Sequence, residues 1–322
     1  MSHQRQGRPA TGRRGMSGTC LGVDIGGTKT RVGLVSAAHR VLDVREAPTP
    51  AQDGARAVLQ VVAKLGRELC RESTDVAAWG VGTAGVVDPA SGTIVAATDA
   101  LGGWAGTPVA RELAALGSLP VYVDNDVNAF ALGEAAAGAV AGQAHVLAVA
   151  VGTGIGGAFL LHGRVWRGAH HNAGEIGHIP LPGFGHRPCP CGASGHLESV
   201  AAGPAMAARY HELSGEGVTF ADVARRADGD DRLAAEVVDE GGRVLGQLLA
   251  GLANAIDPES VVVGGGVAQP AGRYWSAAER HYREHLLPAA REVPLLPALL
   301  GKDAVLVGAA ELARRGISER TP

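Results

Sequence analysis

The stretch LGVDIGGTKTRVGLVSAAHRVL at residues 21–42 decides the fold, because HVLAVAVGTGIGGAFLLHGRVW at residues 145–166 repeats its pattern. Apolar and glycine positions coincide in the two copies: Leu21 with Leu147, Gly26 with Gly152, and Leu34 with Leu160. Each copy predicts a strand, a glycine-rich turn, a second strand, a turn and a third strand. The period is far longer than that of a solenoid unit. We therefore predict two lobes built from the same α/β unit, with a ligand-binding cleft between them.

Helical and extended patterns alternate in the rest of the chain. Helices are predicted at residues 53–73, 107–116, 203–213, 219–227, 231–255, 275–286 and 303–315. Further strands are predicted at residues 76–83, 120–124 and 260–263. We divide the chain into a disordered tail (1–18), an N-terminal lobe (19–126), a C-terminal lobe (127–302) with a loop-rich insert (163–198), and a C-terminal helix and tail (303–322).

The composition excludes several classes of protein. The chain has 322 residues, of which 46% are hydrophobic, so it can bury the cores of two lobes. Its formal net charge of -3 argues against nucleic-acid binding, because neutralising phosphates needs a basic surface. No apolar run is long enough to cross a membrane, and 4 cysteines are too few for a disulfide framework. We expect a cytoplasmic protein that binds neither nucleic acid nor membranes.

The turn of the first copy has the composition of a phosphate-binding loop. Gly26 and Gly27 have no side chain to keep backbone N–H groups away from phosphate oxygens. Thr28 adds a hydroxyl, Lys29 adds a positive charge, and Asp24 can hold Mg²⁺ through water. A strand follows instead of the helix that a Walker A loop requires. An ordinary hairpin turn is the alternative.

The turn of the second copy, GTGIGG at residues 152–157, formally matches the dinucleotide fingerprint. That fingerprint requires the turn to open a helix, but a strand pattern follows here. We therefore expect Gly152, Thr153 and Gly154 to form a second phosphate-facing hairpin.

A polar segment, DNDVN at residues 124–128, follows the strand predicted at 120–124. Carboxylates and amides at a strand-to-helix junction suit a base that takes a proton from a bound hydroxyl. The same residues are common as an Asx turn and helix cap. From this segment alone, the capping interpretation is the better supported.

The insert carries four potential metal ligands, namely His178, Cys189, Cys191 and His196. Two thiolates and two imidazoles with no open position describe a structural, tetrahedral Zn²⁺ site. A bound ion would fix the loop and place Glu175 and Glu198 in the cleft. The alternative is two unrelated surface thiols with histidines nearby.

Seven motifs in this order resemble the ROK family of repressors, open reading frames and kinases: DIGGTKT (24–30), GTAGVVD (82–88), DNDVNA (124–129), GTGIGG (152–157), GEIGH (174–178), CPCG (189–192) and VVVGGGV (261–267). The resemblance covers the chain from about residue 20 onward. It implies the actin-like, hexokinase-type fold of two α/β lobes. It also implies an ATP-dependent hexose kinase that uses Mg²⁺ and a structural Zn²⁺ and assembles as a homodimer or homotetramer.

The resemblance assigns roles to individual residues. Asp126 would be the general base that takes the proton of the sugar O6 hydroxyl. The sugar would be bound by Gly85, Asn125, Glu175, His178 and Glu198, with His178 bridging the zinc and the sugar. The ATP phosphates would lie along Gly26, Gly27, Thr28, Gly152, Thr153 and Gly154, and the adenosine near Gly264 and Gly265.

The chain departs from the family pattern at two positions. His196 stands where the pattern C-x-C-G-x-x-G-C has its third cysteine, and Asp124 stands where glutamate is common. Histidine is a competent zinc ligand, so we expect the site to survive with altered geometry. Only 23 residues precede Asp24, too few for the helix-turn-helix of the repressors.

The substrate and donor stay open at this point. Glucose is our first expectation. N-acetylglucosamine, N-acetylmannosamine or fructose kinases of the same family are alternatives, as is a sugar sensor without catalysis. A donor such as polyphosphate is also compatible with these motifs.

Overall fold

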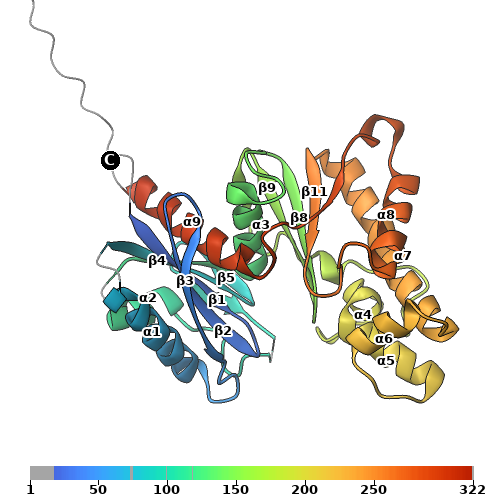
Figure 1. Ribbon diagram of the computed structural model, residues 1–322, viewed down its shortest axis with the longest axis horizontal. Helices are drawn as coiled ribbons and strands as arrows, with labels where there is room; N and C mark the ends of the chain where they lie inside the picture. Colours follow the sequence, from blue (N-terminus) through green and yellow to red (C-terminus); the bar gives the residue numbers. More distant parts are fainter. Residues whose placement is uncertain (1–17, 73–74, 99, 118, 321–322) are drawn as a thin grey trace, which may run out of the picture.

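Two five-stranded sheets organise the computed structural model, one in each lobe (Figure 1). The structure describes residues 18–72, 75–98, 100–117 and 119–320, so the predicted disordered tail lies outside it except for Gly18. The N-terminal sheet has the order β3 (Val41–Pro48), β2 (Lys29–Val35), β1 (Thr19–Ile25), β4 (Val76–Thr83), β7 (Val121–Asn125). The C-terminal sheet has the order β10 (Arg164–Trp166), β9 (Ile155–Leu161), β8 (Val146–Val151), β11 (Ser260–Gly264), β12 (Leu295–Pro297).

Both sheets pair their strands in the same way, so the predicted internal repeat is confirmed. In each sheet, two antiparallel pairings are followed by two parallel ones. The two glycine-rich turns differ in length, however. The first lies between the pair Ile25 and Thr30, and the second between the pair Val151 and Ile155, so the second is one residue shorter.

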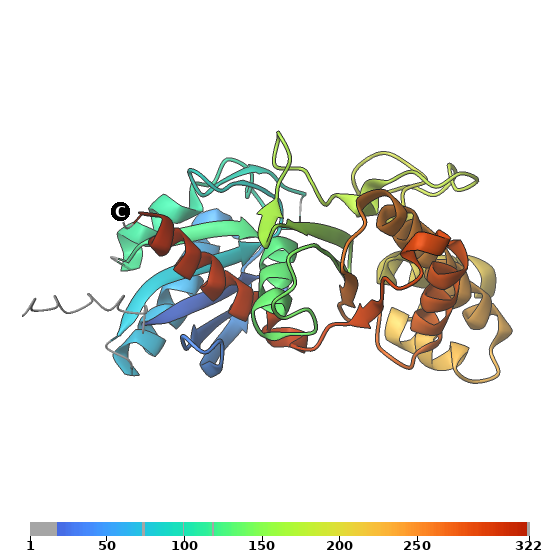
Figure 2. The same cartoon turned by 90° about the horizontal axis from the view of Figure 1, so that it is seen from above.

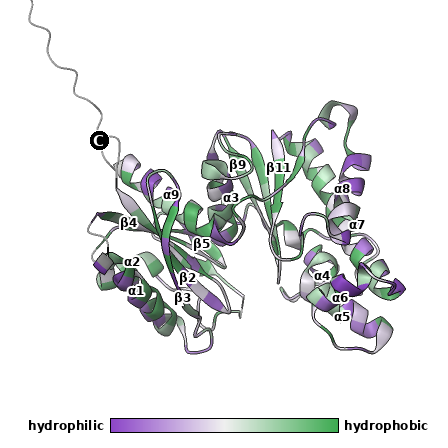
Figure 3. Cartoon of the chain, viewed as in Figure 1, coloured by the Kyte–Doolittle hydropathy of each residue, from purple (hydrophilic) through white to green (hydrophobic). Residues whose placement is uncertain are grey.

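Helices cover both faces of each sheet. They are α1 (Ala55–Glu72), α2 (Val109–Gly117), α3 (Asp126–Ala137), α4 (Glu198–Ala201), α5 (Gly203–Ser214), α6 (Phe220–Ala227), α7 (Arg232–Ile256), α8 (Arg273–His285) and α9 (Ala304–Arg320). Shorter elements are the hairpin of β5 (Val86–Asp88) and β6 (Thr93–Ala96), and 3₁₀ turns at Ile176–His178, Pro288–Ala290 and Gly301–Asp303. Apolar strands lie inside, and the outer helices carry polar residues on their exposed faces (Figure 3).

The centre of the molecule consists of α3 and α9, which lie side by side between the two sheets (Figures 1 and 2). Although α9 is last in sequence, it packs on β1 and β4 of the N-terminal sheet. Glycines make this approach possible, because a β-carbon at Gly22 would overlap the carbonyl oxygen of Leu306. Between the two helices, a β-carbon at Gly308 would overlap the carbonyl oxygen of Ala129. The high glycine content therefore brings α9 close to both partners.

The predicted helices and long strands are present in the structure, with ends that differ by a few residues. The hairpin of β5 and β6 and the three-residue strand β12 were not predicted, because they are too short to show a periodic pattern. No helix in the described part of the chain is long and apolar enough to cross a membrane. The lobe boundary at residues 126 and 127 stays a prediction; it falls at the start of α3.

Candidate active site

A cavity of about 480 Å³ lies between the lobes, where parallel strands of both sheets end. Asp24 lies near the carboxyl end of β1, Asp126 follows β7, and Gly264 ends β11. Ligands of open α/β sheets bind beyond the carboxyl ends of strands, so this is the expected position for a site. Other residues that line the cavity are Arg31, Phe130, Gly265, Gln269, Pro297 and Lys302.

The wall formed by Gly264 and Gly265 has no room for side chains. A β-carbon at Gly264 would lie 2.9 Å from the ring of Phe130. Gly265 has a φ of +99°, in the region that favours glycine, and a β-carbon there would overlap the carbonyl oxygen of Val151. Packing within the protein therefore requires glycine at both positions, and the adenosine contact expected here stays a prediction.

The two predicted phosphate turns lie outside the set of described residues that line the cavity. This set includes neither Gly26, Gly27, Thr28 and Lys29 nor Gly152, Thr153 and Gly154. The Nζ atom of Lys29 lies 2.9 Å from Oε1 of Glu46 and is largely exposed. The second turn instead lies against the insert, because a β-carbon at Gly154 would be 2.6 Å from Oε2 of Glu198.

Asp126 is the first residue of α3, and Asn125 is its N-cap. The Asn125 Oδ1 atom accepts hydrogen bonds from the backbone N–H of Val127 at 2.8 Å and of Asn128 at 3.3 Å. Its Nδ2 donates to the carbonyl oxygen of Gly85 at 3.1 Å. The capping interpretation is therefore confirmed. Most of the hydrogen-bonding capacity of Asn125 is used within the protein, and its role as a sugar ligand stays a prediction.

Burial raises the pKa of two carboxylates in this cavity. It is the main cause that raises the pKa of Asp24 to about 6, with a further increase from the charge of Asp126 and an opposing effect of Arg31. Burial also raises the pKa of Asp126, and the N–H of Val127 opposes the shift. Carboxylates with pKa values shifted towards neutrality are typical of catalytic acids and bases.

Sequence reasoning missed Arg31, which is 8% exposed. Its guanidinium donates to the carbonyl oxygen of Lys302 and to Oδ1 of Asp303, the latter at 2.7 Å. These partners precede α9 and are more than 270 positions away in the sequence, so no local pattern could have indicated the contact.

The insert gathers the acidic residues that were predicted to bind a sugar. Oε2 of Glu198 accepts a hydrogen bond from the backbone N–H of Ile155 at 2.8 Å. Oε2 of Glu175 lies 3.8 Å from Nε2 of His178. Burial raises the pKa of Glu175; His178 lowers it, and the charges of Glu198 and Asp126 raise it further. The insert and the start of α3 therefore share one electrostatic environment.

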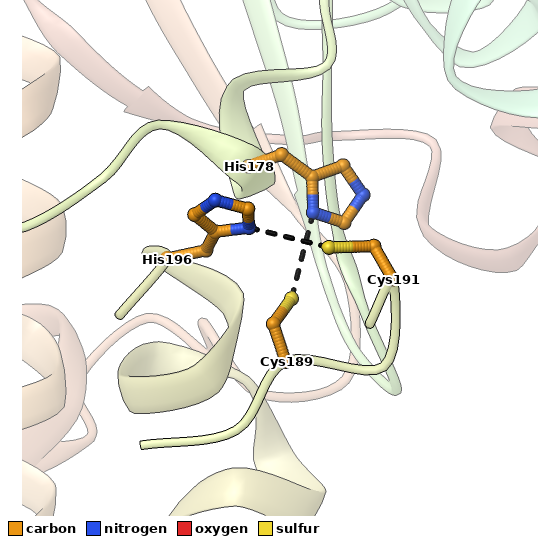
Figure 4. A group of neighbouring side chains, drawn as sticks. All are labelled: His178, Cys189, Cys191 and His196. Carbon is orange, nitrogen blue, oxygen red and sulfur yellow. Dashed lines mark hydrogen bonds between the residues drawn. The ribbon is translucent and has the colours of Figure 1, made fainter. Parts of the chain in front are cut away.

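The four predicted metal ligands converge in the insert, with one ligand atom of each within 4.8 Å of all the others (Figure 4). Cys189 Sγ lies 3.6 Å from His178 Nδ1, and Cys191 Sγ lies 3.3 Å from His196 Nδ1. A tetrahedral zinc ion with Zn–S of about 2.3 Å and Zn–N of about 2.0 Å requires sulfur–nitrogen edges of about 3.5 Å. The donor set therefore fits zinc.

The protonation of this cluster depends on whether a cation is bound. Burial is the main cause that raises the pKa of the Cys189 thiol to about 11. Without a cation, the thiol thus stays protonated at neutral pH, whereas a bound metal would deprotonate it. His178 turns Nδ1 towards Cys189 and Nε2 towards Glu175, so it lies between the cluster and the acidic residues.

Nearly the whole chain is similar to known proteins. The ROK family model matches residues 20–316. A glucokinase of Halalkalibacterium halodurans is 33% identical to this chain, and the alignment covers 92% of this chain and 94% of the relative. The structure of a ROK hexokinase from Thermus thermophilus has a TM-score of 0.84 and 36% identity, covering 94% of this chain and 99% of that one. A ROK glucokinase from Streptomyces griseus, solved with glucose and AMPPNP, has a TM-score of 0.79 and 33% identity, covering 93% of this chain and 100% of that one.

Proposed function

We propose that this chain, which belongs to the ROK family, phosphorylates glucose at O6 with Asp126 as the general base. The chain is an ATP-dependent hexose kinase with the actin-like, hexokinase-type fold, as the sequence motifs predicted. The observation that carries the proposal is the position of Asp126. This half-buried carboxylate lines the cavity between the lobes and interacts electrostatically with Glu175 of the insert.

The two substrates would meet at Asp126. ATP·Mg²⁺ would occupy the cavity, with adenosine against Gly264 and Gly265 and the metal held by Asp24 through water. Its phosphates would extend towards the two glycine-rich turns. The sugar would lie between the start of α3 and the insert, where Asn125, Gly85, Glu175, His178 and Glu198 would contact its hydroxyls.

In the reaction, the sugar O6 forms a bond to the γ-phosphorus while the bond from that phosphorus to the β-γ bridging oxygen breaks. Asp126 accepts the proton of the O6 hydroxyl. Because the transition state of phosphoryl transfer is loose, positioning and charge neutralisation supply most of the catalysis. A positioned base contributes about 10²–10⁴-fold.

Zinc would be held by His178, Cys189, Cys191 and His196. It would supply rigidity, because a closed four-ligand site fixes the loop that carries Glu175 and leads to Glu198. If Nδ1 of His178 bound the metal, its Nε2 would remain free to face Glu175, whose Oε2 lies 3.8 Å away.

The test is ADP release by the purified protein with Mg-ATP and a panel of glucose, fructose, mannose, N-acetylglucosamine and N-acetylmannosamine, with polyphosphate as a second donor. Asp126→Asn should lower kcat about 10²–10⁴-fold. Asp231→Asn, which alters the N-cap of α7 far from the cavity, serves as the control. If no sugar stimulates ADP release from folded, zinc-loaded protein, the kinase proposal fails and a sugar sensor takes its place.

We also propose a cytoplasmic homodimer or homotetramer that binds neither nucleic acid nor membranes. Light scattering of the purified protein tests the assembly, and a gel-shift assay with DNA should show no complex.

A further inference from the structure

The two carboxylate oxygens of Asp124 accept hydrogen bonds from two different segments of the chain. Asp124 is the second-last residue of β7 and is 1% exposed. Its Oδ1 accepts hydrogen bonds from the backbone N–H of Asn125 and from Nδ2 of Asn128, both at 2.8 Å. Its Oδ2 accepts from Nε of Arg167 at 3.0 Å and from Nη2 of the same guanidinium. One oxygen therefore fixes the turn that carries Asp126, and the other binds a residue of the C-terminal sheet's loop.

Arg167 begins the loop that leads to Glu175. It follows β10, and its carbonyl oxygen accepts a hydrogen bond from the backbone N–H of Ala173 at 3.1 Å, which closes the loop on itself. At the far end, the carbonyl oxygen of Gly174 accepts from the N–H of Gly157 on β9 at 2.8 Å. The loop from Arg167 to Glu175 is short and is hydrogen-bonded at both ends. The position of the Arg167 guanidinium therefore influences the position of Glu175.

The same loop has a second contact with the N-terminal lobe. Nε2 of His171 lies 3.8 Å from Oδ1 of Asp88 in the hairpin of β5 and β6. His171 has a φ of +62°, which costs free energy in a residue with a β-carbon. The loop is therefore held against the N-terminal lobe at its start and at its middle.

Net stabilisation is a poor explanation for a buried ion pair. Removing two charges from water costs as much as their attraction returns, and an apolar pair of similar size is often equally stable. A carboxylate that receives two N–H groups of one guanidinium is, by contrast, fixed in distance and orientation. The pair of Arg167 and Asp124 is thus better suited to hold two segments in register than to stabilise the fold.

We propose that Arg167 is a positioning residue of the kinase. Through Asp124, it fixes the loop 167–175 against the turn of Asn125 and Asp126, so that the sugar ligands of the insert and the base act on the same hydroxyl. This inference rests on the proposed roles of Asp126 and Glu175.

The test compares Arg167→Lys, Arg167→Ala and Asp124→Asn with the wild-type protein. Lysine keeps the buried positive charge but cannot reproduce the two hydrogen bonds that the planar guanidinium donates to Oδ2 of Asp124, so Arg167→Lys should retain the fold and lose the orientation. Because one charge-assisted hydrogen bond is lost, we expect the KM for glucose to rise about 10- to 100-fold and kcat to fall. The KM for ATP should stay unchanged, because Arg167 and Asp124 are not among the described residues that line the nucleotide cavity.

A matched control is Arg273→Lys. Arg273 also donates two hydrogen bonds to one carboxylate, that of Asp239, at 2.9 and 2.7 Å, but this pair joins α8 to α7 away from the cleft. Arg273→Lys should leave both KM values unchanged. The double variant Arg167→Ala/Asp124→Asn should lose no more than the worse single variant, because both remove the same contact.

The outcomes separate this inference from the proposed function. If the wild type is active and depends on Asp126, but the Arg167 variants keep the wild-type KM for glucose, the positioning role alone is overturned. Equal increases in the KM for glucose and the KM for ATP would also overturn the positioning role. The same holds if the decrease in kcat is explained entirely by a smaller fraction of folded protein. If the wild type phosphorylates no sugar, the proposed function fails, and the positioning role fails with it.

Discussion

Replacing Asp24 by asparagine should make the protein more stable at neutral pH and less active. The carboxylate titrates at about 6 in the folded chain against 3.8 in an ordinary aspartate. Because each tenfold change in proton affinity is worth about 1.4 kcal/mol, the ionised carboxylate costs the folded state about 3 kcal/mol at pH 7. Asparagine has nearly the same shape and carries no charge, so it removes this cost.

The sign of the pH dependence follows from proton binding. Between pH 3.8 and about 6, the folded state keeps the Asp24 proton and the unfolded state has released it. The contribution of Asp24 to stability is therefore present below pH 3.8 and is lost as the pH rises through 6. Asp24→Asn should match the wild type near pH 4 and exceed it by about 2–3 kcal/mol near pH 7.

Urea unfolding at pH 4.5, 5.5, 6.5 and 7.5, followed by circular dichroism, measures this difference. Asp231→Asn is a control of opposite sign, because hydrogen bonds from Tyr210 and the backbone lower the pKa of Asp231. A gap between Asp24→Asn and wild type that is the same at every pH would refute the reasoning, as would a variant less stable at pH 7.5. A loss of ADP release in the same variant would show that the protein keeps the destabilising carboxylate for its reaction.

Three further predictions concern packing, metal and pH. Gly308→Ala should destabilise the protein by about 1–3 kcal/mol in urea unfolding, because its β-carbon would overlap the carbonyl oxygen of Ala129. Gly251→Ala in α7, where a β-carbon meets nothing within 4 Å, should instead stabilise it by about 0.5–1 kcal/mol. His196→Cys should retain one zinc per chain by elemental analysis, whereas His196→Ala should lose it and unfold at a lower temperature. Because burial raises the pKa of Asp126, kcat/KM should decline on the acidic side at a higher pH than an ordinary aspartate would give; a profile flat down to pH 4 would contradict this.

The fold could be predicted from the repeat because equivalent positions in the two copies are always separated by the same number of residues. β2 at Lys29–Val35 and β9 at Ile155–Leu161 are equivalent strands of their sheets and begin and end at matching positions of the two quoted stretches. The pairing register of the hairpins was harder to predict. Ile25 pairs with Thr30, whereas Val151 pairs with Ile155, a shift of one residue that no pattern of glycines could indicate.

The metal cluster was predictable because its chemistry is local. All four ligands lie between His178 and His196, so the types of residue and their short separation were visible in the sequence. The contacts of Arg31 and Arg167 could not be predicted from the sequence. Arg31 binds a residue 271 positions away and Arg167 one 43 positions away, and the residues around each arginine do not indicate these partners. Only the three-dimensional structure shows which charged residues join distant segments.

The segment at residues 124–128 shows why cap and catalytic base could not be told apart in the sequence. Asn125 caps α3, so Asp126 stands at the first helical position, where the N–H groups and the helix dipole favour a negative charge. Burial in the cavity works in the opposite direction and raises the pKa of Asp126. In the proposed reaction, Asp126 must be ionised to accept a proton, and the cap favours this ionised form against the effect of burial. The cap would therefore take part in catalysis, since it holds the carboxylate at the cavity and limits the cost of its charge there.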